Sequence, residues 1–190
     1  KNNKGILFWI TGFSGSGKTQ LAKKIYPSIK KQYGPTVLLS GDDIRKIFNL
    51  KGYTYKERYD TVMKYCKLAK FVTNQNVNVI FAVIGMMDKI RHWNRKNIQN
   101  YVEIYIKSDL KLVMSKKKKK IYKKKTKNVV GLDIKAEHPK KPHIILKNNF
   151  KKKIEIYAKE LQSKIDNHLN WLKNCLIDIQ ITVDLINSCL

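Results

Sequence analysis

Short apolar runs alternate along the chain with longer stretches in which apolar residues recur every three or four positions. Two runs, Ile6–Ile10 and Val77–Ile84, contain at most one polar residue each. Such runs are typical of strands buried on both faces, as in a parallel sheet between two helical layers. Three shorter strands are predicted, at Thr36–Leu39, Tyr101–Ile106 and His143–Leu146.

Helical patterns occupy the stretches between these runs. The first predicted helix ends near Gly34-Pro35, a pair typical of a helix terminus. Strands that alternate with helices indicate βαβ units, so the chain is predicted to have an α/β fold with a mostly parallel sheet flanked by helices. The predicted helices cover Lys18–Gln32, 43–48, 55–75, 88–98 and Phe150 to about Asp166.

The last 24 residues form an apolar tail. We therefore divide the chain into a main domain, 1–166, and this tail, 167–190. Steps of three and four residues between apolar positions favour a helix, whereas the alternation from Ile177 to Leu185 is typical of a strand. The helical pattern is longer and contains no Gly or Pro, so we favour the helix; its apolar face would pack on the main domain or on a second copy in a homodimer. The helical pattern consists of Leu169, Leu172, Leu176, Ile179, Val183, Ile186 and Leu190.

Composition and charge indicate a folded, strongly basic protein. The chain has 190 residues, of which 43% are hydrophobic, enough for a sizeable core and too many for a disordered basic tail. Lys and Arg number 40 against 14 Asp and Glu, giving a formal net charge of +26. Such an excess favours polyanionic partners: nucleotides, nucleic acid or anionic lipid.

Other features favour the cytoplasm. Three cysteines, with no CxxC pair, cannot form a complete disulfide framework, which fits a reduced compartment. No stretch approaches the roughly 20 apolar residues of a membrane span. The first apolar run is also too short for the core of a signal peptide. We therefore expect a cytoplasmic protein without a membrane partner.

A glycine-rich turn between the first strand and the first helix carries a nucleotide-binding pattern. Gly12-Phe13-Ser14-Gly15-Ser16-Gly17-Lys18-Thr19 fits G-x-x-x-x-G-K-[ST] at every fixed position, in the strand–loop–helix context that this motif requires. Glycines let successive N–H groups point at phosphate oxygens, and the helix N-terminus adds partial positive charge. Lys18 is expected to reach the β- and γ-phosphates as a catalytic residue, and Thr19 to offer its hydroxyl to Mg²⁺. The predicted ATP-binding residues are Gly12, Ser14, Gly15, Ser16, Gly17, Lys18 and Thr19.

The segment after the second predicted strand adds acidic and basic groups. Its carboxyl end is expected beside the glycine-rich turn, where ligands of α/β sheets bind. Asp42 there could orient an attacking hydroxyl or hold Mg²⁺, and Arg45 could bind an anionic acceptor. Alternatively, Asp42 or Asp43 only caps the next helix, and one of the two is expected to do so.

Together with matches further along the chain, these motifs resemble the adenylylsulfate kinase family. The resemblance covers about residues 5–160 and depends on the order and spacing of several short motifs as much as on the P-loop. The further matches are Leu39–Arg45, Glu57-Arg58, Arg91, Arg95, Tyr101–Ile106, Lys119–Lys124, Val130–Asp133 and Pro139–His143.

This resemblance implies a P-loop nucleoside triphosphate hydrolase fold with a basic lid over about 116–130. It also implies transfer of the γ-phosphate of ATP, with Mg²⁺, to the ribose 3′-hydroxyl of adenylylsulfate. Asp42 would be catalytic, holding Mg²⁺ or the acceptor hydroxyl, while Arg45 and Arg58 would bind the phosphate-bearing side of the acceptor. Tyr53 would stack on the acceptor base, and Lys119 would belong to the lid. The remaining substrate-binding positions would be Ile84, Val129 and Val130.

Several positions depart from the family pattern. The usual D-G-D-N becomes Ser40-Gly41-Asp42-Asp43, so only the second Asp is kept. The usual I-S-P becomes Ile84-Gly85-Met86, so a serine sometimes proposed to be phosphorylated is absent. The usual F-T-G becomes Val129-Val130-Gly131, which removes an aromatic side chain from one face of the acceptor base. One stacking contact is worth about 1–3 kcal/mol, so its loss weakens selection for a purine.

Two segments resemble a particular branch of the family. Asn128–Gly131 and His92–Arg95 are closer to members linked to bacterial surface polysaccharides, one type of which phosphorylates cytidine diphosphoramidate. The acceptor is therefore either adenylylsulfate, giving 3′-phosphoadenylylsulfate, or cytidine diphosphoramidate, used in capsule modification.

The lysine-rich segment, Lys116–Lys127, allows three interpretations: a solvated face, a lid over two nucleotides, or a nucleic-acid surface. Binding to RNA is the least supported, because no pair of stacking aromatic residues accompanies it. The alternative to a kinase is a P-loop switch or an NTPase that acts on nucleic acid. It predicts slow hydrolysis without an acceptor, whereas the kinase predicts ADP release that depends on an acceptor.

Overall fold

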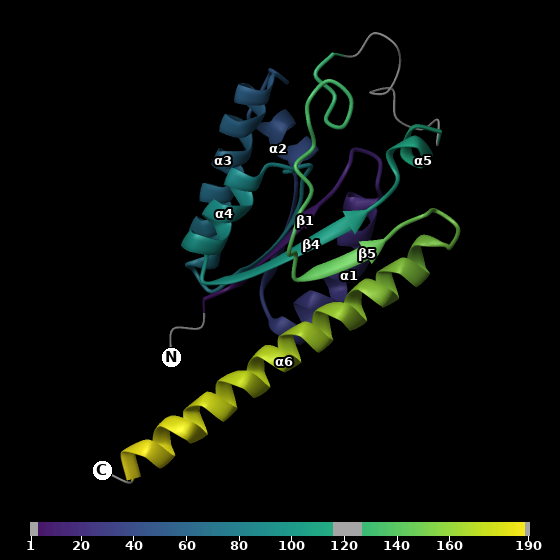
Figure 1. Ribbon diagram of the computed structural model, residues 1–190. Coiled ribbons are helices and arrows are strands. Elements are labelled where there is room, and N and C mark those ends of the chain that lie inside the picture. Colours follow the sequence, from purple (N-terminus) through teal and green to yellow (C-terminus); the bar gives the residue numbers. More distant parts are fainter. Residues whose placement is uncertain (1–3, 116–126, 189–190) are drawn as a thin grey trace.

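A five-stranded sheet forms the centre of the protein (Figure 1). The computed structural model describes residues 4–115 and 127–188, with side chains as far as residue 175. The strand order is β2-β3-β1-β4-β5, and every neighbouring pair is parallel, as predicted. The strands are β1 (Ile6–Thr11), β2 (Thr36–Ser40), β3 (Asn78–Ala82), β4 (Asn100–Lys107) and β5 (Ile144–Lys147).

Helices cover both faces of this sheet (Figure 1). One face is covered by α2 (Gly41–Ile47), α3 (Tyr55–Thr73) and α4 (Asp88–Asn97), and the other by α1 (Lys18–Tyr33) and α6 (Ile154–Ser188). A short helix, α5 (Leu110–Ser115), follows β4. The predicted α/β fold of the P-loop type is thus confirmed.

Strand β1 shows why its sequence has no polar alternation. Phe8 and Ile10 pack toward α1 and α6, whereas Leu7 and Trp9 pack toward α3 and α4. All four side chains are fully buried. Successive side chains of a strand point to opposite faces, so a strand covered on both sides needs an apolar residue at every position.

The last helix begins later than the sequence predicts. Phe150, the predicted first residue, has a φ of 61°, which a helix does not allow. The side chain of Asn148 stabilises this loop, because its Oδ1 accepts the backbone N–H of Phe150 at 2.9 Å. The helix α5 was not predicted, and β3 is shorter than the apolar run that contains it.

In the structure the tail is helical rather than extended, because α6 continues through residue 166 without a break. The helical pattern from Leu176 onward lies outside the residues whose side chains are described. Treating 167–190 as a separate unit therefore stays a prediction. No helix in the described part of the chain has the length and apolar character to span a bilayer.

Candidate functional site

The glycine-rich turn forms a tight loop between β1 and α1. Gly17, directly before the helix, has a φ of 93°, in the left-handed region that favours glycine. A Cβ at Gly12 would lie 2.6 Å from the carbonyl oxygen of Ile106, so this position has no room for a side chain. Glycine is therefore needed at 17 because of the backbone conformation, and at 12 because a side chain would not fit.

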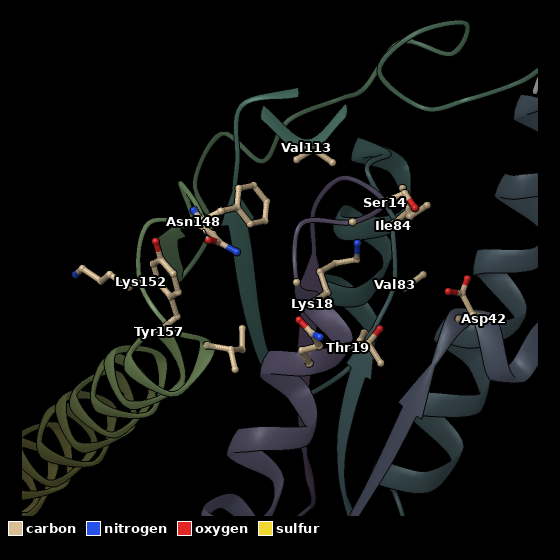
Figure 2. Close-up of a pocket in the computed structure, with 17 residues that line it drawn as sticks. Ser14, Lys18, Thr19, Asp42, Val83, Ile84, Val113, Asn148, Lys152 and Tyr157 are labelled. Atoms are coloured by element: carbon tan, nitrogen blue, oxygen red, sulfur yellow. Dashed lines mark hydrogen bonds between the residues drawn. The ribbon is translucent and has the colours of Figure 1, made fainter. Parts of the chain in front are cut away.

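Lys18 is held inside this loop. Its side chain is only 7% exposed, and Nζ donates a hydrogen bond to the carbonyl oxygen of Phe13 at 2.6 Å. Figure 2 shows the ammonium directed into the curve of the loop. A buried ammonium at this position is suited to neutralising phosphate charge.

A cavity of about 490 Å³ opens above the loop. Of the predicted ATP-binding residues, Ser14, Gly15, Gly17, Lys18 and Thr19 line it. Gly12 and Ser16 do not line it; Ser16 is fully buried behind the loop. Asp42 lines this cavity from the opposite side (Figure 2).

Residues after β5 line the far side of the same cavity and were not predicted. Asn148, Lys152 and Tyr157 lie across the loop from Asp42 (Figure 2), and Phe150 lines the cavity with them. Asn148 is 3% exposed, and its Nδ2 donates to the carbonyl oxygen of Ser16 at 3.0 Å, joining the end of β5 to the P-loop. The predicted strand before them could have indicated that these residues belong to the site, because the carboxyl ends of parallel strands meet at one edge of the sheet.

A second cavity, about 50 Å³ in volume, lies beside the first. Gly41, Asp42, Val83 and Ile84 line both cavities. Asp42 therefore stands between a nucleotide-sized cavity and a smaller pocket beside it. From this position the Asp42 carboxylate can contact a group bound in the first cavity and a group bound in the second.

The two neighbouring aspartates are used differently. Ser40 caps α2, since its Oγ accepts the backbone N–H of Asp43 and donates to the Asp43 carboxylate at 2.6 Å. The expectation that Asp42 or Asp43 caps this helix is therefore wrong: Ser40 is the cap, and both aspartates lie in the first turn. Asp42 is the aspartate that lines the cavities.

Arg45 and Arg58 line the second cavity and share an aromatic neighbour. Their guanidinium carbons lie 4.5 and 5.0 Å from the centroid of the Tyr53 ring. Burial lowers the pKa of Arg58, and the positive charge of Arg45 lowers it further. The ring of Tyr53 therefore supports two adjacent cations whose mutual repulsion a bound anion would relieve.

The segment at 129–130 differs from its predicted arrangement. Val130 lines the second cavity, whereas Val129 is 2% exposed and its carbonyl oxygen accepts N–H groups from Leu132, Asp133 and Ile134. Val129 is thus a residue of the turn rather than of the cavity wall. Lys119 and most of the predicted lid lie outside the described residues.

The position of the missing serine is closely packed. Gly85 has a φ of 32°, and a Cβ there would lie 3.0 Å from the indole ring of Trp9. Ile84 lines both cavities, and its carbonyl oxygen accepts a hydrogen bond from the Thr11 hydroxyl at 2.6 Å. Glycine at 85 is therefore matched to a tryptophan in the central strand.

The other motif arginines have structural partners. Glu103 is 1% exposed; one carboxylate oxygen lies 2.7 Å from Arg95 Nη2, and the other lies 3.6 Å from Arg91 Nε. His143 Nδ1 accepts the backbone N–H of Glu103 at 2.9 Å, and its ring stacks on that of His168 from α6. Within the described residues no group of three His, Cys, Asp or Glu side chains could hold a metal ion on its own.

Comparison with known proteins identifies the family of this chain. The family model of adenylylsulphate kinase matches residues 4–147. The chain belongs to the adenylylsulphate kinase family. It is therefore an ATP-dependent kinase with a hydroxyl group as acceptor, as the sequence predicted.

Individual relatives differ in the acceptor that their names state. A cytidine diphosphoramidate kinase of Campylobacter jejuni is 36% identical over 168 residues, which are 85% of this chain and 98% of that protein. A probable adenylyl-sulfate kinase of Archaeoglobus fulgidus is 30% identical over 146 residues, 74% of this chain and 94% of that protein.

Among solved structures, the Mycobacterium tuberculosis APS kinase in complex with AMPPNP and APS superposes with a TM-score of 0.76. The superposition covers 86% of this chain and 98% of that one at 21% identity, so it supports the fold alone.

Proposed function

We propose that this kinase transfers the γ-phosphate of ATP to the ribose 3′-hydroxyl of cytidine diphosphoramidate. The main support for a second substrate beside ATP is that the two cavities share a wall, with Asp42 between them. The choice of acceptor is supported by the similarity to the Campylobacter enzyme, which extends over nearly all of that protein. Adenylylsulfate is the second candidate, supported by the other relatives.

In this proposal the P-loop binds the phosphates of ATP. Its N–H groups and the ammonium of Lys18 neutralise charge that develops on the transferred phosphoryl group, which is the main contribution of protein groups in such reactions. Lys18 already points into the loop, held by the Phe13 carbonyl, so little reorganisation is needed. Asp42 orients the acceptor hydroxyl toward the phosphate from the second cavity.

Thr19 and Asp42 fit a bound Mg²⁺. Both side chains line the first cavity, and Mg²⁺ is usually held by one or two protein oxygens together with phosphates and water. When bound, Mg²⁺ would supply positive charge that offsets the negative charge of the phosphates.

Arg45 and Arg58 bind the 5′-anhydride of the acceptor in this proposal. Within the described residues neither guanidinium forms an ion pair with a carboxylate, and both guanidinium groups line the second cavity. Hydrogen bonds with Thr54 lower the pKa of Glu57, and the charge of Arg45 lowers it further. Tyr53 supports both side chains and could in addition contact the acceptor base.

A coupled assay of ADP release tests this function. ATP and Mg²⁺ are supplied with cytidine diphosphoramidate, with adenylylsulfate, or with no acceptor. We expect release to depend on the acceptor and kcat/KM to be higher for the cytidine compound. A preference for adenylylsulfate of about 10⁴ would contradict the proposed acceptor, because dedicated polar contacts are usually needed for that ratio. Equal release without acceptor would favour a switch or an NTPase instead.

We further propose a cytoplasmic homodimer. The cytoplasm supplies the ATP that the reaction consumes. The dimer proposal is supported by the exposure of Trp171 (61%) and Leu172 (36%) on α6, which extends well beyond the sheet (Figure 1). Light scattering is expected to give twice the chain mass, and the substitution Trp171→Glu is expected to reduce it. A monomer for the unmodified chain would contradict the dimer.

A further inference from the structure

Three cationic side chains line the second cavity: Arg45, Arg58 and Lys135. Among the described lining residues the only carboxylate is that of Asp42, at the boundary with the ATP cavity. The pocket is therefore strongly positive on the side away from Asp42. Charge of this kind favours an acceptor with more than one anionic group.

Both arginines already have structural hydrogen bonds. Arg45 Nη1 donates to the carbonyl oxygens of Leu50 and Gly52, at 2.9 and 3.1 Å. Arg58 donates from Nε to the Tyr53 carbonyl and from Nη2 to the Asn128 carbonyl, at 2.9 and 2.8 Å. These contacts fix the guanidinium groups, so their positions set where the first anionic group of an acceptor can bind.

Lys135 differs from the arginines in this respect. Its side chain is exposed at the rim of the cavity, and its ammonium has no hydrogen bond or ion pair within the described part of the chain. The backbone beside it is fixed, since Ile134 is 8% exposed, its N–H donates to the carbonyl oxygen of Val129, and its carbonyl oxygen accepts the N–H of Gly131. Lys135 is thus an exposed cation, without a described partner, on a backbone that is held in place.

We infer that Lys135 determines acceptor specificity by binding the distal anionic group of the acceptor's 5′-anhydride. This inference rests on the proposed function and names the part of the substrate that this residue recognises. A 5′-anhydride carries one anionic group beyond the α-phosphate, and a 5′-monophosphate lacks it. An ammonium with three donors and a flexible stem can follow such a group, whereas the two fixed guanidinium groups hold the α-phosphate.

The experiment compares Lys135→Ala and Lys135→Arg with the wild type. Lys140→Ala is the matched control, because Lys140 is an exposed lysine of the same segment that does not line either cavity. Turnover is measured with cytidine diphosphoramidate and with adenylylsulfate. The inhibition constants of CDP and CMP, which differ by the distal phosphate, are measured alongside.

For Lys135→Ala we expect kcat/KM for the anhydrides to fall about 10- to 100-fold, mostly through KM, as for the loss of a charged hydrogen bond. CDP should inhibit more weakly by a similar factor, while inhibition by CMP and the KM for ATP should change less than about twofold. Lys135→Arg should retain most of the affinity, and Lys140→Ala all of it.

The outcomes separate this inference from the proposed function. If the wild type turns over no acceptor, the proposed function is wrong and the inference falls with it. If the wild type is active and Lys135→Ala behaves like Lys140→Ala, the inference alone is wrong. Equal losses for CDP and CMP would also overturn it, because they would assign Lys135 to a group that both nucleotides share. Thermal unfolding of each variant checks that the fold is retained.

Discussion

Asn148 provides the sharpest test of how the P-loop is supported. The substitution Asn148→Ala removes the hydrogen bond to the carbonyl oxygen of Ser16 and the bond to the N–H of Phe150. Ser16 is fully buried, so its carbonyl would lose this donor without access to water. An unsatisfied buried polar group costs about 1–3 kcal/mol, and the second, less buried bond adds about 0.5–1 kcal/mol.

The free energy of unfolding should therefore fall by about 1.5–4 kcal/mol. For a chain of this size that loss corresponds to a decrease in Tm of about 3–16 °C. If about 1.4 kcal/mol of the loss falls on the organisation of the P-loop, ATP should bind about tenfold more weakly. Urea unfolding gives the first quantity, and titration with a fluorescent ATP analogue gives the second.

Asn78→Ala is the control for this experiment. Asn78 is also buried; its Nδ2 donates to the Tyr33 carbonyl and its Oδ1 accepts the Ile6 N–H, so the variant also loses two hydrogen bonds to the backbone, but none to the P-loop or to a residue that lines the ATP cavity. It should lose some stability and keep the affinity for ATP. If both variants bind ATP equally well, Asn148 does not organise the loop and the reasoning is refuted.

Four further outcomes are expected. Lys18→Ala should lower kcat by about 10²–10³ with the fold intact, as for loss of a group that stabilises transition-state charge, and near wild-type turnover would refute the role of the P-loop. Asp42→Asn should reduce kcat more than ATP affinity, which steady-state kinetics and ATP titration together can establish. Arg58→Ala should mainly raise the KM for the acceptor; a loss of ATP binding alone would mean that the two cavities are assigned the wrong way round. Burial, His168 and Arg95 lower the pKa of His143 to about 4 in the folded chain. As the pH falls, the His143 imidazole is therefore protonated in the unfolded chain before it is protonated in the folded one. Stability should therefore fall as the pH drops from about 6.5 toward 4, and His143→Gln should flatten that dependence in urea unfolding.

The sheet and the phosphate-binding loop could be predicted because their signals are local. An unbroken apolar run such as Ile6–Ile10 and a glycine pattern with fixed spacing each determine a structure within a few residues. Helix α5 has no comparable local signal, and the late start of α6 depends on a loop that the Asn148 side chain stabilises.

The walls of the cavities were harder to predict because distant segments form them. Asp42 and Arg45 were expected at the site, and they line the second cavity. Lys135 carried no motif, and its place at the rim follows from the turn that begins at Val129. Val129 itself was expected in the wall, but three N–H groups bonded to its carbonyl oxygen place it in that turn instead.

The contact between Gly85 and Trp9 limits how this chain can evolve. A Cβ at 85 would lie 3.0 to 3.3 Å from the indole ring, so a serine there would require the ring to move by a few tenths of an ångström. Trp9 is fully buried against Phe81, and truncating such a residue costs about 3–5 kcal/mol. Because the two residues are in contact, we expect the effects of substitutions at 9 and 85 on stability to be non-additive, which is epistasis between the two positions.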